Sequence, residues 1–511
     1  MASSEHEKRH LENQVTRPHQ RQYEDKNQVN ATSSSEKPYT VFTTWEKRLV
    51  ALTMGISMLF SPMTANIYFP AIPTLATAMS VSVQQINVTI TTYIVLQGIS
   101  PLFIGDLADK FGRRPIYLLT FAIYTAASLG LALNDDSYAV LLSLRTLQSA
   151  GCSATAAISY GVLADVAMPS KRGSMLGAAM VAANVGPTLG PLLGGILTGK
   201  LGWHWIFWFC TILGGTFFCV VMMVFPETSR KIVDNGSIRA EPLARPVLAI
   251  LVRYPRNAKK ARDGSHGSSL HKIRLPNPMP ALRVIFYRDT ALVLWISAIH
   301  YAAYYCLQAT MPTLFSAHPY TLSPLQVGMT YISIGIGVAL GGFINGKTLD
   351  YNYRVTASRK GIVVNEVSGD DLSLFPIERA RTRFSLLFIP ADAALLIGYG
   401  WICQNAASCH MSIPLIFQFL LGFLQTCIVQ TFNTLLVDIF PTNPSTASAA
   451  GNITRCALSA GAIAAVQPLL DQLGWSWVFT ILGLLAGCPS IIATLMLRKE
   501  GMKWRKSRGS K

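Results

Sequence analysis

Long apolar stretches alternate with short polar ones along most of this chain. A helix needs about 20 mainly apolar residues to cross a bilayer, and twelve stretches have roughly that length. In chain order they are residues 49–70, 87–105, 116–134, 139–163, 175–199, 205–225, 290–315, 327–346, 384–403, 412–437, 447–470 and 475–497. The pattern predicts an all-α polytopic membrane protein with twelve transmembrane helices.

Composition and charge agree with this topology. Half of the residues are hydrophobic and 14% are charged, whereas a soluble domain carries about 25% charged residues. Of the 43 lysines and arginines, 40 fall in segments that a twelve-helix count places on one side. Short loops rich in positive charge stay cytoplasmic, so we expect both termini in the cytosol. The net charge of +17 is then a topology and lipid-headgroup signal and predicts no nucleic-acid partner.

A polar, basic segment, 226–289, divides the helices into two groups of six, 49–225 and 290–497. The sequence LGWHWIF at 201–207 recurs as LGWSWVF at 473–479, an offset of 272 residues. The repeat predicts two pseudo-symmetric six-helix bundles around a central cleft. Three further polar segments are expected on the cytoplasmic side: a disordered tail 1–48, an insert 347–383 within the second bundle and a basic tail 498–511.

The segment GDLADKFGRRP, 105–115, combines glycine and charge between two apolar runs. We interpret it as a short hairpin at the membrane face, in which glycines permit tight turning and an aspartate pairs with an arginine. Such a cluster can latch helix ends in one state and release them in another. The alternative is simple anchoring by positive charge. The residues concerned are Gly105, Asp106, Asp109, Gly112, Arg113 and Arg114.

Charged residues inside apolar runs are candidates for coupling proton and cargo binding. Arg145 should face protein or water and not lipid, where its charge can bind a carboxylate or lower the pKa of one. Gln148, one turn on, could share the contact. Structural bracing and snorkelling are the alternatives. The further candidates are Asp165, Asp392 and Arg455. Asp392 is the clearest carboxylate within an apolar stretch, with a structural role as its alternative, and the sequence names no single proton carrier.

The fifth predicted helix carries small and kinking residues at spacings of three and four, which place them on one helix face. They are Gly186, Pro187, Gly190, Pro191, Gly194 and Gly195. Small residues allow close helix approach and prolines bend the helix. The pattern indicates either a bend and sliding surface for transport or plain close packing.

Together these motifs resemble the major facilitator superfamily over about residues 45–497. GDLADKFGRRP resembles the signature between helices two and three, and LRTLQSAG at 144–151 resembles the arginine signature of helix four. ANVGPTLGPLLGG at 183–195 resembles the helix-five signature of drug:proton antiporters. NIYFPAIPTLA at 66–76 resembles the end of helix one in the same twelve-helix exporters. In the second half, TLDYNYR, ERARTR, LLVDIFP and ASAAGNITRCALSAG resemble the fungal branch that includes quinidine, polyamine and dityrosine exporters.

The resemblance implies a monomeric carrier that exports a small organic molecule in exchange for protons, without ATP or another cofactor. It places cargo contacts on helices one, four, seven and ten and leaves helix nine, with Asp392, outside the cleft. The cleft candidates are Asn66, Tyr68, Tyr301, Tyr304, Tyr305, Gln308, Gln418, Gln425 and Asn433. Aromatic and amide groups suit amphipathic or cationic molecules, although tyrosines also gather at membrane interfaces.

Several alternatives stay open at this point. An importer or facilitator of the same fold is the nearest one, and a transport-inactive sensor or a multi-pass enzyme is further away. The plasma membrane is the expected location, with the vacuolar membrane second.

GGFINGKT at 341–348 matches the phosphate-loop pattern, but it ends an apolar helix and predicts no nucleotide site. No catalytic or metal site is expected. Cys403 and Cys409 could form a disulfide in an outer loop, and Asn87 is a candidate glycosylation site.

Overall fold

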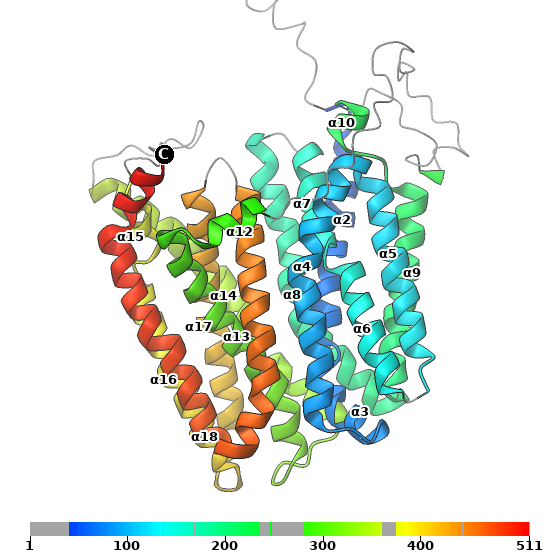
Figure 1. Cartoon of the computed structure of the whole chain (residues 1–511), viewed down its shortest axis with the longest axis vertical. Coiled ribbons are helices and arrows are strands. Elements are labelled where there is room, and N and C mark those ends of the chain that lie inside the picture. Colours follow the sequence, from blue (N-terminus) through cyan, green and yellow to red (C-terminus); the bar gives the residue numbers. More distant parts are fainter. Residues whose placement is uncertain are drawn as a thin grey trace, which may run out of the picture.

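The computed structural model describes residues 40–135, 137–166, 169–235, 246–247, 279–359, 375–440 and 444–509. Its elements are helices arranged as two bundles side by side, blue to green for the first half and green to red for the second (Figure 1). The first half contains α2 (Thr44–Asn66), η2 (Phe69–Ala71), α3 (Ile72–Ala78), α4 (Val83–Phe111), α5 (Arg113–Ala132), α6 (Tyr138–Cys152), α7 (Thr155–Val166), α8 (Pro169–Leu201), α9 (His204–Val224) and α10 (Arg230–Val233). The second contains α12 (Met279–Ile285), α13 (Arg288–Ser316), α14 (Pro324–Arg359), α15 (Ile377–Arg381), α16 (Ser385–Gln404), η4 (Ala406–Ser408), α17 (Ser412–Ile439) and α18 (Pro444–Gly509).

All twelve predicted apolar stretches are helical, and nine helical segments of the described residues are long and apolar enough to cross a membrane. The fourth predicted helix is interrupted between α6 and α7. The eleventh and twelfth both lie within α18, where Gly474 breaks the helix with a φ of 73°. Gly202, its counterpart in the sequence repeat, has a φ of 93°. The repeated motif therefore encodes the same left-handed turn in each half, which favours glycine.

Several expected boundaries were wrong because the helices extend beyond the apolar stretches. The segment from Gly105 to Phe111 is the last part of α4 and not a loop, so the hairpin is reduced to Gly112, whose φ is 104°. Residues 347–359 of the expected insert continue α14, and α18 continues through the expected C-terminal tail to Gly509. The expected disordered tail 1–48 is too long, because α2 begins at Thr44 with a capping box between Thr43 and Glu46. The rest of that tail, most of 226–289 and residues 360–374 lie outside the described residues.

The helices α10, α12 and α15 and the last turns of α18 lie at one end of the bundles (Figure 1). We call this end, defined by Arg113, Arg230 and Arg381, the basic end, and the other the opposite end. The backbone amide of Val41 bonds to the carbonyl of Asn235 beside α10, so α2 also begins at the basic end. The described chain begins and ends at the basic end, which agrees with an even number of membrane crossings.

The two halves are joined along α4 and α18 and along α8 and α14, from mid-helix toward the opposite end. The side chains of Gln84, Thr91 and Asn452 form the three hydrogen bonds recorded between the halves of the described chain, at 2.7, 3.5 and 3.1 Å. A Cβ on Gly195 of α8 would lie 2.7 Å from the Cα of Gly328 on α14. Among the described residues no ion pair joins the halves at the basic end. The structure is thus a conformation closed toward the opposite end.

Candidate functional site

A fully buried arginine occupies the middle of the first bundle. Arg145 of α6 donates from Nη1 to Oε1 of Gln148 at 2.8 Å and to the carbonyl of Thr64 at 3.4 Å. Its guanidinium lies 4.5 Å from the ring centroids of both Tyr68 and Tyr93. Its Nε and Nη2 have no hydrogen-bond partner. Arg145 and Gln148, one turn apart on α6, are therefore in direct contact.

This arrangement leaves a charge that the described protein does not neutralise. Two aromatic faces stabilise a guanidinium by cation–π attraction, worth about 2 kcal/mol or more when desolvated. A buried cation without a carboxylate is still costly. Two free N–H donors and a fixed positive charge suit a carboxylate ligand, which guanidinium binds with two parallel hydrogen bonds.

A second arginine reaches the interface of the halves from the C-terminal bundle. Arg455 of α18 lies 5.2 Å from the ring centroid of Tyr301 on α13, and its Nε has no partner. The hydroxyl of Tyr301 is 3.4 Å from that of Tyr305, whose ring is 6.3 Å from Phe69 of the first half. Five of the cleft and coupling candidates therefore lie in aromatic–arginine clusters: Tyr68, Arg145, Tyr301, Tyr305 and Arg455.

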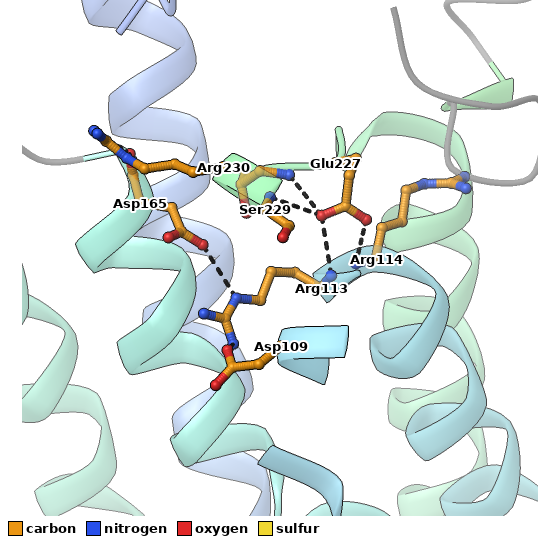
Figure 2. A network of polar contacts seen from close by, with 8 residues as sticks. Asp109, Arg113, Arg114, Asp165, Glu227, Ser229 and Arg230 are labelled. Atoms are coloured by element: carbon orange, nitrogen blue, oxygen red, sulfur yellow. Dashed lines mark hydrogen bonds and ion pairs between the residues drawn. The ribbon is translucent and has the colours of Figure 1, made fainter. Parts of the chain in front are cut away.

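The basic end of the first half carries an ion-pair network that involves Asp109, Arg113 and Asp165 (Figure 2). The guanidinium of Arg113 forms an ion pair with Asp109 and, through Nε at 3.1 Å, another with Asp165 of α7. Asp106 pairs separately with Lys110 of the same helix at 2.5 Å. A Cβ on Gly161 would collide with the Arg113 guanidinium, so this glycine makes room for the pair. Gly105, by contrast, is not needed for close approach, because a Cβ there would be 3.8 Å from Ala157.

Glu227 and Arg114 connect α5 to α9 in the same network (Figure 2). The Glu227 carboxylate accepts from the backbone amides of Arg113 and Arg114 at 3.0 and 3.1 Å, at the positive end of the α5 dipole. The Arg114 guanidinium donates to the carbonyls of Met222 and Phe225 at 2.6 and 2.8 Å, at the C-terminal end of α9. The Glu227 carboxylate thus lies at the positive N-terminal end of α5, and the Arg114 guanidinium lies at the negative C-terminal end of α9. Each side chain bonds to backbone groups that have no partner within the helix.

The second half has a related ion pair at its basic end. Arg381 of α15 bonds through Nε to Asp438 of α17 at 2.8 Å and donates to the carbonyl of Leu349 at 3.4 Å. Asp438 ends α17 much as Asp165 ends α7. The pseudo-symmetry of the sequence therefore extends to the ion pairs.

Comparison with known proteins gives this geometry a family. A model of the Major Facilitator Superfamily matches residues 54–464. The chain belongs to the Major Facilitator Superfamily. The superfamily inferred from the motifs is confirmed, and the relatives below agree with its fungal branch.

Related members of the superfamily cover nearly the whole chain. "MFS-type transporter phiD" of Fungal sp. is 37% identical over 489 residues, 94% of this chain and 72% of that protein. "Citrate exporter 1" of Aspergillus niger is 31% identical over 490 residues, 94% of this chain and 91% of that protein. A crystal structure of the human organic anion transporter MFSD10 covers 88% of this chain and 99% of its own, with a TM-score of 0.53 and 18% identity, which supports the fold alone. The protein is a multi-pass membrane transporter and not an enzyme.

The remaining candidates for cargo and proton binding do not form a single cluster. Asn433 accepts from Ser297 at 3.1 Å, and Gln418 donates to Tyr399 at 3.2 Å. Both amide atoms of Gln308 are buried without a partner, as is Oδ1 of Asn66. Asp392 is fully buried beside His300, and Gln425 lies next to it.

The glycine face of the fifth predicted helix, in α8, packs against α2 and α14. A Cβ on Gly190 would be 2.7 Å from the carbonyl oxygen of Met63, and one on Gly194 would collide with the carbonyl of Ile67. Gly186 approaches Pro62 in the same way, while Pro187 and Pro191 lie within the helix. Close packing is therefore one real role of this motif.

Two minor expectations are corrected, and the rejection of a phosphate loop stands. Cys403 lies buried in α16 and not in the outer loop, and both it and Cys409 are free thiols. Asn87 is buried in the first turns of α4, which makes it inaccessible as a glycosylation acceptor. The GGFINGKT segment lies within the continuous helix α14, so no strand precedes it.

Sequence reasoning missed Tyr93, Glu227 and His300. Glu227 had a weak signal, an acidic residue directly after the apolar run of α9. His300 was visible as the single histidine of the seventh apolar stretch. Tyr93 gave no signal, because its role depends on the packing of α4 against α6.

Proposed function

We propose that this transporter exports a small organic molecule from the cytosol in exchange for protons, by rocking its two halves between conformations closed at opposite ends. The observation that carries the proposal is Arg145, buried between Tyr68 and Tyr93 with two guanidinium nitrogens unpartnered. A membrane-buried cation is a functional-site hypothesis by default. The contacts between the halves near the opposite end supply the moving interface.

The same observation favours an anionic cargo, such as an organic acid or an acidic secondary metabolite. Arg145 and Arg455 each present an unpartnered guanidinium nitrogen beside an aromatic ring. These positive charges would repel a cationic drug or a polyamine. The relative named as a citrate exporter supports an acidic cargo, and the resemblance of α8 to the antiporter signature supports export over import.

The proposed orientation places the basic end in the cytosol, most simply in the plasma membrane. The supporting observation is the concentration of lysine and arginine in segments at that end. The proton gradient would be the energy source, with no ATP and no cofactor, and the carrier would act as a monomer.

The test is uptake into sealed inside-out vesicles carrying the full-length protein, with and without an acidic interior. The panel contains citrate, an aromatic carboxylate, tetraphenylphosphonium and spermidine. We expect carboxylate uptake only with the acidic interior. Arg145→Ala should lower it roughly 10- to 100-fold, since a hydrogen bond to a charged group contributes about 1.5–3 kcal/mol.

Two controls sharpen this result. Arg145→Lys keeps the charge but cannot present a planar fork between two rings, so it should recover only part of the activity. Arg48→Ala removes an exposed cation at the start of α2 and should leave uptake unchanged. Equal carboxylate flux without a pH gradient would indicate a facilitator, and gradient-driven uptake of the two cations alone would contradict the anionic cargo.

A further inference from the structure

A histidine and an aspartate face each other inside the C-terminal bundle, away from Arg145. Nε2 of His300 on α13 lies 3.7 Å from Oδ2 of Asp392 on α16, and both side chains are completely buried. Nδ1 of His300 lies 2.8 Å from the carbonyl of Ile296, one turn back on the same helix. Nδ1 must therefore carry a proton and donate, which leaves Nε2 as the free lone pair that faces the carboxyl group.

The pair is unsatisfied in this conformation. Neither Nε2 of His300 nor either oxygen of Asp392 has a hydrogen-bond partner. Buried polar groups without partners are costly, and more so within a bilayer. A single proton between the two side chains would satisfy two of these three atoms, Nε2 of His300 and the carboxyl oxygen that faces it.

Charge balance gives the same answer. With a neutral imidazole and an ionised carboxylate, the pair carries one uncompensated negative charge in the membrane interior. Binding of one proton, either as a carboxylic acid facing Nε2 or as an imidazolium facing the carboxylate, makes the pair neutral overall. The protonated form is therefore the one that a low-dielectric interior stabilises.

Among the described residues, no other charge neutralises Asp392. The residue recorded beside its carboxyl group is Gln425 of α17, an uncharged amide that approaches the carboxyl group outside hydrogen-bonding geometry. Asp392 is the single charged residue of α16, and the single one of α17, Asp438, is paired with Arg381 at the basic end. On α13 the other charged residues, Arg288 and Asp289, lie in the first turn, where Asp289 binds Arg508. On the membrane part of α18, Arg455 lies over Tyr301, and Asp471 bonds to Gln467.

We propose that His300 and Asp392 form the proton-binding site of the transport cycle. This inference rests on the proton exchange of the proposed function. Helix α13 connects the two sites, because it carries His300 next to Tyr301, whose ring holds Arg455. Proton binding changes the charge packed behind α13, while cargo binds on the tyrosine-bearing side of the same helix. One rigid element that both ligands bias is a sufficient physical route for coupling.

The first test measures the proton directly and needs no cargo. Infrared spectroscopy of the full-length protein in liposomes follows the carbonyl band of protonated carboxyl groups while the pH is changed from about 4 to 9, the range that spans ordinary and strongly shifted carboxyl groups. We expect one component of the titrating band, distinct from that of Glu378, to be absent in Asp392→Asn and its midpoint to move by about one pH unit or more in His300→Gln. Asp471→Asn, which removes an exposed carboxylate of α18, should leave the band unchanged.

The second test measures coupling with the same variant. The amide introduced by Asp392→Asn would mimic the permanently protonated carboxyl group. This variant should therefore lose gradient-driven citrate uptake roughly 10-fold or more while retaining exchange of internal for external citrate within about twofold. Gradient-driven uptake in both the wild type and Asp392→Asn would overturn the assignment, as would a band in Asp392→Asn that titrates identically to that of the wild type. If Asp392→Asn does not fold, His300→Gln serves as the variant in both measurements. A wild-type protein without gradient-dependent uptake, but with the Asp392 band, would refute the proposed antiport and leave the proton site in place.

Discussion

At the scale of single residues, Glu227 binds several backbone amides at the basic end. Its carboxylate accepts from four backbone amides, those of Arg113, Arg114, Thr228 and Ser229. Glu227→Gln replaces one acceptor oxygen by a donor, which leaves buried amides unsatisfied. We expect a loss of about 1–3 kcal/mol in the free energy of unfolding, measured as a lower thermal unfolding temperature in detergent.

The matched control for this prediction is Glu46→Gln. Glu46 also accepts from a backbone amide, that of Thr43, in the capping box of α2, but at an exposed site. Water can replace the lost contact there, so the effect should stay below about 1 kcal/mol. Equal losses in the two variants would show that Glu227 acts as an ordinary helix cap.

The residues of the site that the sequence predicts are those whose environment is local. Arg145 stands out as a charge inside an apolar run, and Gln148 shares its contact because three residues separate neighbours on a helix face. The ring of Tyr93 comes from another helix, and the partner of His300 lies 92 residues further on. Such pairs are fixed by how helices pack and rotate against one another, which hydropathy does not encode.

At the scale of elements, helix lengths show the same limit. Hydropathy reports the part of a helix that lies in hydrocarbon, whereas α14 and α18 continue into polar sequence. The extension of α18 is held by two contacts: Arg505 donates to the carbonyl of Phe375 at 2.7 Å, and Arg508 pairs with Asp289 at 2.7 Å. On the extension of α14, the carbonyl of Leu349 accepts from Arg381 at 3.4 Å. The repeat and the count of apolar stretches predicted the bundles correctly. They contained no information about the contacts of Arg505 and Arg508 with α13 and the residues around α15, which we call the polar cap of the second half.

The polar cap predicts a pH effect through Glu378 of α15. Burial raises the pKa of Glu378, although Arg505 nearby opposes the shift. The native protein therefore binds this proton more readily than the unfolded chain, and the ionised carboxylate costs stability at neutral pH. Glu378→Gln should unfold at a higher temperature than the wild type at about pH 7, and the difference should vanish as the pH falls toward the ordinary glutamate pKa of about 4.3.

Glu500→Gln provides the comparison for the pH effect. Glu500 lies on the same extension of α18, and Lys503, its partner at 3.1 Å, is largely exposed. Its replacement should change stability by no more than about 0.5 kcal/mol at either pH. A Glu378→Gln variant that is less stable than the wild type at neutral pH would show that the contact with Arg505 outweighs the burial of the carboxylate.

At the scale of the whole molecule, two adjacent glycines separate packing within a half from packing between halves. Gly194 faces Ile67, the C-cap residue of α2 in the same half, whereas Gly195 faces Gly328 of α14 across the interface. Gly195→Ala should therefore spare the first bundle and strain the conformation closed toward the opposite end. Overpacking costs about 1–3 kcal/mol, which changes the ratio of the two conformations by a factor of roughly 5 to 150.

This shift can be measured as a distance between spin labels at Ser137 and Ser408, which are exposed in the turns of the two halves at the opposite end. The exposed native thiols Cys219 and Cys488 are replaced first. We expect a longer-distance population in Gly195→Ala that is minor in the parent protein. Gly215→Ala is the control, because a Cβ there would only touch Thr125 at 3.6 Å within the first half. Unchanged distances in Gly195→Ala would mean that α8 and α14 separate without cost, and the Gly195–Gly328 contact would then have no part in the transport cycle. A longer distance confined to Gly195→Ala would instead identify this contact as the closure that the carrier must break to release cargo at the opposite end.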